Sequence, residues 1–109
     1  MPPSVSVLLL DETNDLFVSS VSVWEIASKH QLGKLPLAVE PKEWISKITA
    51  DIDAGALPFT AAHALMVSSL APVHRDPFDR MLICQAKVEG LTILTADEAI
   101  RQYDVPILW

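Results

Sequence analysis

The sequence has few of the residues that several classes of protein require. Its 109 residues include a single cysteine, Cys84, which has no disulfide partner and lies in an apolar stretch where core packing is its expected role. The apolar run at residues 7–10 is far shorter than the roughly 20 residues of a membrane-spanning helix. The first residues carry no basic signal-peptide head. These absences predict a cytoplasmic protein that does not enter a membrane.

Basic residues are also scarce. The chain has 8 Lys and Arg against 14 Asp and Glu, a formal net charge of -6 at pH 7. Nonspecific attraction to a nucleic-acid backbone depends on basic groups that displace counterions, so any contact with nucleic acid has to be local. Half of the residues are hydrophobic, which is enough for the core of one domain over residues 1–109.

Short apolar strands alternate with helical patterns along the chain. Strands are predicted at residues 16–19, 55–59, 91–95 and 105–109, and helices at residues 22–36, 40–52, 61–70, 77–89 and 96–103. This alternation predicts an α/β fold with a mainly parallel sheet and helices on both of its faces.

Several residues indicate where these helices begin and end. Pro41 and Pro77 suit first helical positions, Thr60 suits an N-cap, and Gly33 and Gly90 suit helix ends. The apolar residues 5–10 are harder to place, because a parallel crossover to the next strand needs about a dozen residues. That segment is either a hairpin partner of the next strand or the end of a helix.

Four acids, Glu25, Asp76, Asp79 and Asp97, are predicted in the first turns of helices. Capping explains each of them singly: Ser22 with Glu25 has the spacing of a capping box, and Asp76 and Asp97 suit N-caps. As a group they suggest a site, because helices that follow parallel strands begin at the edge where α/β folds bind ligands.

A cluster of carboxylates repels itself unless a cation neutralises it. Mg²⁺ or Mn²⁺ suits this set, since all the ligands are hard oxygens and the sequence offers no Cys or paired-His set for zinc. Such an ion can orient a water and stabilise the charge that develops on a phosphate during phosphodiester cleavage. We therefore expect these four acids to share a divalent ion at the edge of the sheet.

Substrate contacts are expected from basic residues near the same edge. Arg75, Arg80, Lys29 and Lys34 can hold an RNA backbone, and the alternative for all four is ordinary surface charge. Arg80 comes first among them because it follows Asp79 on an otherwise apolar helix. The hydroxyl of Thr95 can hold the water or a neighbouring acid. A further residue, His63, lies on an amphipathic helix and is expected at the surface or the edge of the core.

Four blocks of the sequence together resemble the PIN-domain proteins, in particular VapC-like toxins of bacterial toxin–antitoxin pairs. The blocks are "LFVSSVSVWEIASKHQLGKLPL", "HRDPFDRMLICQA", "GLTILTADEAI" and "VPILW". The resemblance implies an α/β/α sandwich and a Mg²⁺- or Mn²⁺-dependent ribonuclease. Its catalytic metal ligands would be Glu25, Asp79 and Asp97, with Asp76 as a further ligand or only a cap. The resemblance also implies homo-oligomers and an antitoxin whose segment lies across the acidic site.

One block of the family pattern is displaced. The family opens with a strand ending in an acid some thirty or more residues before the "WE" motif, whereas Asp11 in "LLLDETN" lies only fourteen positions before Glu25. We therefore expect a chain that lacks the first strand, the first helix and the first metal-binding acid of the family. The exposed strand edges would then pair within a homo-oligomer or a strand-swapped arrangement.

Two functions follow from these features. The first is a PIN-type ribonuclease, with its activity reduced by the loss of the first acid. The alternative is a noncatalytic protein-binding module or inactive truncated toxin, in which the acids only cap helices and exposed apolar surface binds an antitoxin or a second copy.

Overall fold

The computed structural model describes residues 13–70, 76–94 and 107–108. The chain divides into two compact units, with a boundary between Pro58 and Phe59. The N-terminal unit comprises described residues 13–58. The C-terminal unit comprises described residues 59–70, 76–94 and 107–108.

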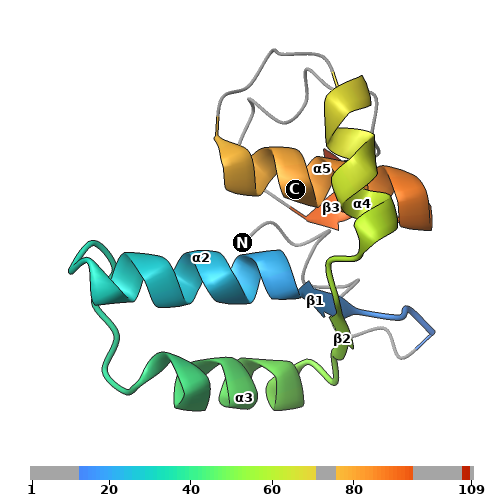
Figure 1. Ribbon diagram of the computed structural model, residues 1–109. Helices are drawn as coiled ribbons and strands as arrows, with labels where there is room; N and C mark the ends of the chain where they lie inside the picture. The colour runs from blue at the N-terminus through green and yellow to red at the C-terminus, as the bar shows by residue number, and fades with distance from the viewer. Residues whose placement is uncertain (1–12, 71–75, 95–106, 109) are drawn as a thin grey trace. The chain divides into compact units, whose positions relative to one another are not determined.

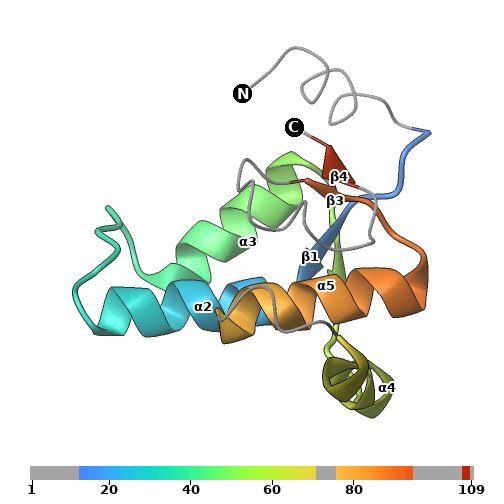
Figure 2. The ribbon, with the colours of Figure 1, turned by 90° about the horizontal axis from the view of Figure 1, so that it is seen from above.

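The N-terminal unit is a parallel strand pair with a helical crossover (Figure 1). Strand β1 (Phe17–Ser19) pairs with β2 (Gly55–Leu57), with Phe17 opposite Gly55 and Ser19 opposite Leu57. Helices α2 (Ser20–Gln31) and α3 (Pro41–Asp51) connect the two strands and lie side by side in both views (Figures 1 and 2). This order is the strand–helix–strand arrangement that parallel pairing requires.

The start of α2 differs from the prediction. Ser19, the last residue of β1, is the N-cap, and its buried hydroxyl accepts a hydrogen bond of 3.0 Å from the Val21 N–H. Ser22 therefore lies inside the first turn, and the predicted capping box of Ser22 with Glu25 is wrong. Glu25 falls in the second turn, because the helix begins directly where the strand ends.

The other predicted signals of this unit are confirmed. Gly33, just after α2, has a left-handed backbone with φ of 73°, and its N–H donates to the carbonyl of His30. A left-handed residue is the common end of a helix, and glycine adopts it without a steric penalty. Pro41 occupies the first position of α3, where its missing N–H costs no hydrogen bond.

The C-terminal unit is built on two crossing helices. Helix α4 (Ala61–Met66), followed by a 3₁₀ turn η1 (Val67–Ser69), crosses α5 (Pro77–Glu89) at a steep angle (Figures 1 and 2). The core consists of Leu70, Ile83 and Cys84, with Met66, Val67 and Ile93 packed against it. Gly90 ends α5 in a left-handed conformation, as predicted.

Strands β3 (Ile93–Leu94) and β4 (Ile107–Leu108) pair in parallel in the same unit. Both described strand pairs are thus parallel, and described helices separate β1, β2 and β3 along the chain, which confirms the predicted α/β class. The uncertain segment at residues 5–10 and the helix predicted at residues 96–103 lie outside the described residues. None of the described helices is long and apolar enough to cross a membrane.

The prediction for His63 is wrong. Its ring is fully buried, with 0% of its surface exposed, although the residue lies on an amphipathic helix. The reason is a set of polar partners within the same unit: the Thr60 N–H donates to Nδ1 at 2.9 Å, and Nε2 lies 2.8 Å from Oε1 of Glu89. A buried imidazole is tolerated when both nitrogens have hydrogen-bond partners.

Replacing Ser19 and Ser22 by alanine, one at a time, tests the observed start of α2. We expect Ser19→Ala to lower the free energy of unfolding by about 1 kcal/mol, because the Val21 N–H loses its acceptor. Ser22→Ala should change it by less than about 0.5 kcal/mol. Urea unfolding followed by circular dichroism measures both. A larger loss for Ser22→Ala than for Ser19→Ala would contradict this cap.

Candidate active site

The start of α5 carries two of the predicted acids. Asp76 is the N-cap, and its Oδ1 accepts hydrogen bonds from the N–H groups of Phe78 at 2.9 Å and Asp79 at 3.3 Å. Pro77 occupies the first helical position. These bonds confirm the predicted cap, and they use one of the two carboxylate oxygens of Asp76. A metal-binding role of Asp76 through its other oxygen stays a prediction.

Asp79 lies in the first turn of α5, as predicted, and is partly buried. The partial positive charge at the N-terminus of a helix stabilises negative charge there. Asp76 and Asp79 both lie at this end of α5, so the helix dipole stabilises the negative charge of both carboxylates. The donor chemistry fits Mg²⁺ or Mn²⁺, which prefer carboxylate oxygens.

Glu25 belongs to the N-terminal unit and lies in an ion pair. Its carboxylate oxygen Oε2 lies 2.6 Å from Nζ of Lys29, one helical turn later, and its side chain is only 19% exposed. Residues four apart face each other on a helix, so the pair forms without any change in the backbone. A cation at Glu25 would compete with Lys29 for this carboxylate. Lys29 thus contacts a predicted metal ligand.

The other predicted site residues Arg75, Thr95 and Asp97 lie outside the described residues. Within residues 13–70, 76–94 and 107–108, no group of three or more His, Cys, Asp and Glu side chains is arranged to hold a metal ion. Glu25 and Asp79 belong to different units. The meeting of Glu25, Asp79 and Asp97 at one ion therefore stays a prediction.

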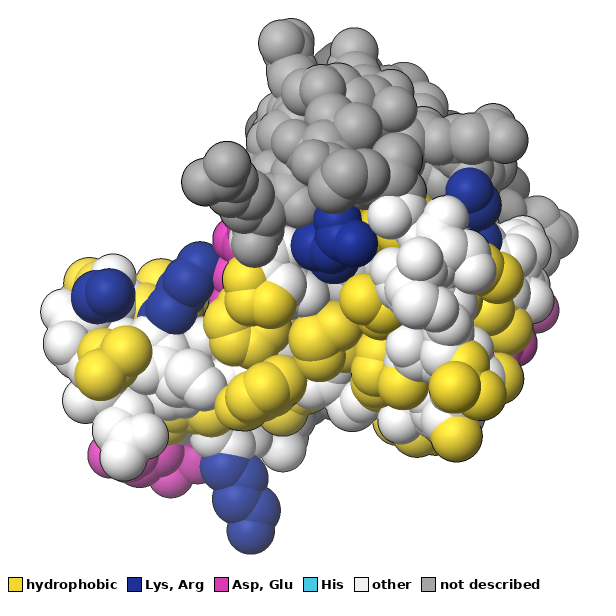
Figure 3. Space-filling view, turned by 45° about the horizontal axis from the view of Figure 1, so that its top comes forward, with side chains coloured by type: hydrophobic (Ala, Val, Ile, Leu, Met, Phe, Trp, Pro, Cys, Tyr) yellow, Lys and Arg dark blue, Asp and Glu magenta, His cyan; other side chains and the backbone are white. Residues whose placement is uncertain are grey.

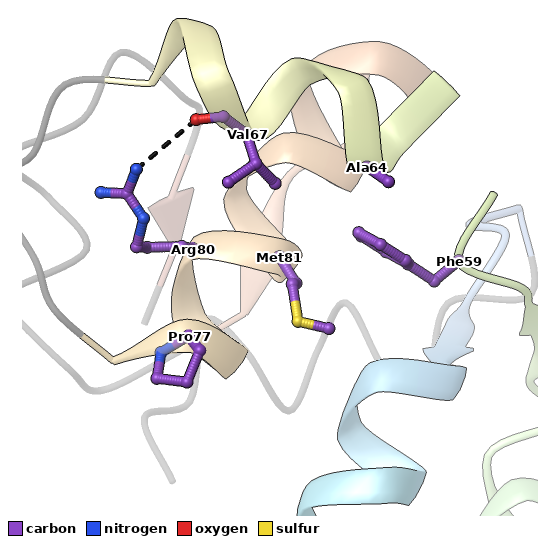
Figure 4. A pocket seen from close by; sticks show the side chains of 6 residues that line it. All are labelled: Phe59, Ala64, Val67, Pro77, Arg80 and Met81. Carbon is purple, nitrogen blue, oxygen red and sulfur yellow. Dashed lines mark hydrogen bonds between the residues drawn. The ribbon is translucent and has the colours of Figure 1, made fainter. Parts of the chain in front are cut away.

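Arg80 supports the fold of its own unit. Its Nη2 donates to the carbonyl oxygen of Val67 at 3.5 Å, which ties α5 to the 3₁₀ turn (Figure 4). The side chain is partly buried. A role in holding substrate stays a prediction, and it has to be compatible with this structural contact.

Arg80 also lines a largely apolar pocket of about 510 Å³ between α4 and α5. The lining residues, drawn in Figure 4, are Phe59, Ala64, Val67, Pro77, Arg80 and Met81. An α-helix turns by about 100° per residue, so Asp79 points about 160° away from both Pro77 and Met81. The pocket therefore lies on a different side of α5 from the predicted metal ligand.

Some of the basic side chains of the described residues are held by acids of the same helix. Lys29 pairs with Glu25 and Lys47 pairs with Asp51. On the face drawn in Figure 3, Lys and Arg side chains lie beside hydrophobic, uncharged and acidic ones. This distribution agrees with the net charge of -6.

Sequence reasoning missed the paired side chains of His63 and Glu89. The detectable signal was the spacing of Thr60 and His63, which is that of a capping box with His in place of the usual Glu or Gln. The structure contains both halves of this box. No local pattern predicts Glu89 as the second partner, because it lies 26 residues further along the chain.

Comparison with known proteins identifies the family. The PIN domain model matches residues 4–106, which is nearly the whole chain. The chain belongs to the PIN-domain family. This PIN domain is also 26% identical over 98 residues to Ribonuclease VapC22 of Mycobacterium tuberculosis, a similarity that covers 89% of this chain and 74% of that protein. The family resemblance stated from the sequence motifs is therefore confirmed.

Two substitutions separate the capping role of Asp76 from its charge. Asp76→Ala should lower the free energy of unfolding by about 1 kcal/mol, because two amides of α5 lose their acceptor. Asp76→Asn keeps a side-chain oxygen and should stay within about 0.5 kcal/mol of the parent protein. Urea unfolding measures the difference. Equal losses in both variants would show that charge, and not the cap, matters.

Proposed function

We propose that this PIN domain is a divalent-metal-dependent endoribonuclease, the toxin component of a toxin–antitoxin system. The observation that carries the proposal is the similarity to a ribonuclease over 89% of the chain. The residues that the family model matches, 4–106, span the positions of the three predicted catalytic acids, Glu25, Asp79 and Asp97. The acids at the start of α5 add the donor chemistry.

Glu25, Asp79 and Asp97 would hold Mg²⁺ or Mn²⁺, with Asp76 as an additional ligand. When bound, such an ion supplies charge stabilisation to the phosphate under attack and makes a water more reactive. The protein's own part begins with Asp76, whose cap holds the first turn of α5 in place and with it the backbone of Asp79.

The remaining predicted residues act on the substrate. Arg80, Arg75 and Lys29 would contact RNA phosphates, and the hydroxyl of Thr95 would orient a water or a neighbouring acid. Lys29 lies against Glu25, so it would move from this carboxylate to a phosphate when the cation binds. Single contacts of this kind suit a chain whose net charge does not attract RNA as a whole.

The proposed partners are RNA, a cognate antitoxin and a second copy of the chain, in the cytoplasm. Among the described strands, β1 pairs with β2 and β3 pairs with β4. Strand pairing between two copies is one way in which such a homo-oligomer could form, and a strand-swapped arrangement is one version of it.

Cleavage of RNA tests the proposal directly. The purified chain should cleave single-stranded RNA in the presence of Mn²⁺, and EDTA should abolish the cleavage. Asp79→Asn and Glu25→Gln should each reduce the rate at least about 100-fold, because a lost ligand removes several kcal/mol of charge stabilisation.

The matched control is Glu43→Gln, which alters an exposed acid in the first turn of α3. Its cleavage rate should equal that of the parent protein. Cleavage that is the same in Asp79→Asn and in the parent protein would contradict catalysis by this site.

Metal binding has a separate readout in thermal stability. An ion at ten times its dissociation constant that binds only the folded state should stabilise it by roughly 1.4 kcal/mol. For a domain of this size the Tm should then rise by several degrees. Asp79→Asn should reduce the rise and Glu43→Gln should not. An unchanged Tm at millimolar Mg²⁺ and Mn²⁺ would argue against the metal site.

The second candidate is a noncatalytic protein-binding module or an inactive toxin. The ion pair of Glu25 with Lys29 favours it, because this carboxylate already has a cationic partner. Such a module would neither cleave RNA nor gain stability from Mg²⁺ or Mn²⁺. The two experiments above therefore distinguish the candidates.

A further inference from the structure

The first turn of α4 is joined to the last turn of α5 through one buried imidazole. The Thr60 N–H donates to Nδ1 of His63, and Nε2 of the same ring lies 2.8 Å from the carboxylate of Glu89. The ring of Phe59 lies against the imidazole, with centroids 5.5 Å apart and planes tilted by 47°. These contacts all lie within the C-terminal unit.

The partners determine the protonation state of the ring. A backbone N–H can only donate, so Nδ1 must offer its lone pair to Thr60. A carboxylate accepts hydrogen bonds, so Nε2 carries the ring proton and donates a hydrogen bond to Glu89. The arrangement therefore requires the neutral imidazole with its hydrogen on Nε2.

A second proton on the ring has a defined consequence. It binds to Nδ1, which then faces the Thr60 N–H as another donor, and two donors cannot form a hydrogen bond. The bond from Nε2 to Glu89 remains and becomes charge-assisted. Protonation thus breaks one half of the capping box and keeps the connection between the two helices.

We propose that His63 is an acid-sensitive switch for the start of α4. In its neutral form it accepts the Thr60 N–H, and when it gains a proton this bond is lost. The hydroxyl and the carbonyl of Thr60 still accept from the N–H groups of His63 and Ala64. Phe59 precedes Thr60 and lines the apolar pocket between α4 and α5, so the lost bond loosens the backbone next to one wall of that pocket. The inference is independent of ribonuclease activity, because it concerns residues outside the proposed metal site.

Few other ionisable groups of the described residues can contribute. Elements α4, η1 and β3 contain none apart from His63. On α5, Glu89 faces the ring directly, and burial raises the pKa of the Cys84 thiol, which stays neutral in acid. The remaining ionisable side chains of α5 are Asp79, Arg80 and Lys87. Of these, Arg80 is bonded to the Val67 carbonyl and Lys87 is exposed.

Nuclear magnetic resonance on the ¹⁵N-labelled full chain tests the switch. Long-range ¹H–¹⁵N spectra should show His63 protonated on Nε2 alone at about pH 8 and on both nitrogens at about pH 5. The hydrogen-exchange protection factor of the Thr60 amide should fall about tenfold over this interval, as expected for the loss of one hydrogen bond. The buried Ile83 amide of α5 should keep its protection.

Two variants serve as controls. Gln at the third helical position of a capping box can accept the Thr60 N–H but does not titrate, so His63→Gln should keep Thr60 protected at both pH values. His63→Ala should leave Thr60 unprotected at both.

Three results would overturn the proposal: a proton on Nδ1 at pH 8, a ring that stays neutral at pH 5, or Thr60 protection that is the same at both pH values in the parent protein. A His63→Gln chain that loses Thr60 protection in acid like the parent would also overturn it. If either variant fails to fold, the ring protonation and Thr60 protection of the parent protein still decide.

Discussion

The hydrogen bonds that Asp76 accepts at the start of α5 establish the register of the helix on which the C-terminal unit depends. They satisfy the N–H groups of Phe78 and Asp79, which have no partner inside the helix. Starting at Pro77, the helix places Ile83 and Cys84 in the core. A shift of one residue would turn these side chains by about 100° and expose part of the core.

The same register separates two sides of α5. Asp79 lies on the side opposite Pro77 and Met81, so the predicted metal ligand and the apolar pocket do not share a surface of this helix. The apolar residues of α5 therefore have two locations: some are buried in the core and others line the pocket. The first turn of α5 combines a cap and a carboxylate, and the middle of the helix supplies the core.

Carboxylates in this chain act first on the protein itself. Asp76 caps α5, Glu25 pairs with Lys29 on α2, and Glu89 accepts from the buried His63. Each contact leaves part of the carboxylate's capacity for hydrogen bonds or metal binding unused, since an ionised carboxylate has about four lone-pair sites. Structural and catalytic roles of these acids are therefore compatible, and the proposed metal site requires such a double use at Asp76 and Glu25.

The residues predicted correctly from the sequence act through their own backbone. Pro41, Pro77, Thr60 and Gly90 lie where expected, because a fixed φ, a capping hydroxyl or a left-handed conformation is a local property. The start of α2, in contrast, does not depend on one residue alone. Ser19 and Ser22 are both acceptable caps, and the end of β1, which is determined by its pairing with β2, selects Ser19.

By itself, the sequence determined the α/β class, the order of the described helices and strands, the motifs of the PIN family and the acids at the start of α5. These depend on spacing along the chain and on the conformational preferences of single residues. Only the tertiary structure decided that His63 is buried, that Glu89 completes its hydrogen bonds and that Arg80 binds the Val67 carbonyl. Those contacts join residues 13 and 26 positions apart, and the packing of α4 and η1 on α5 brings them together.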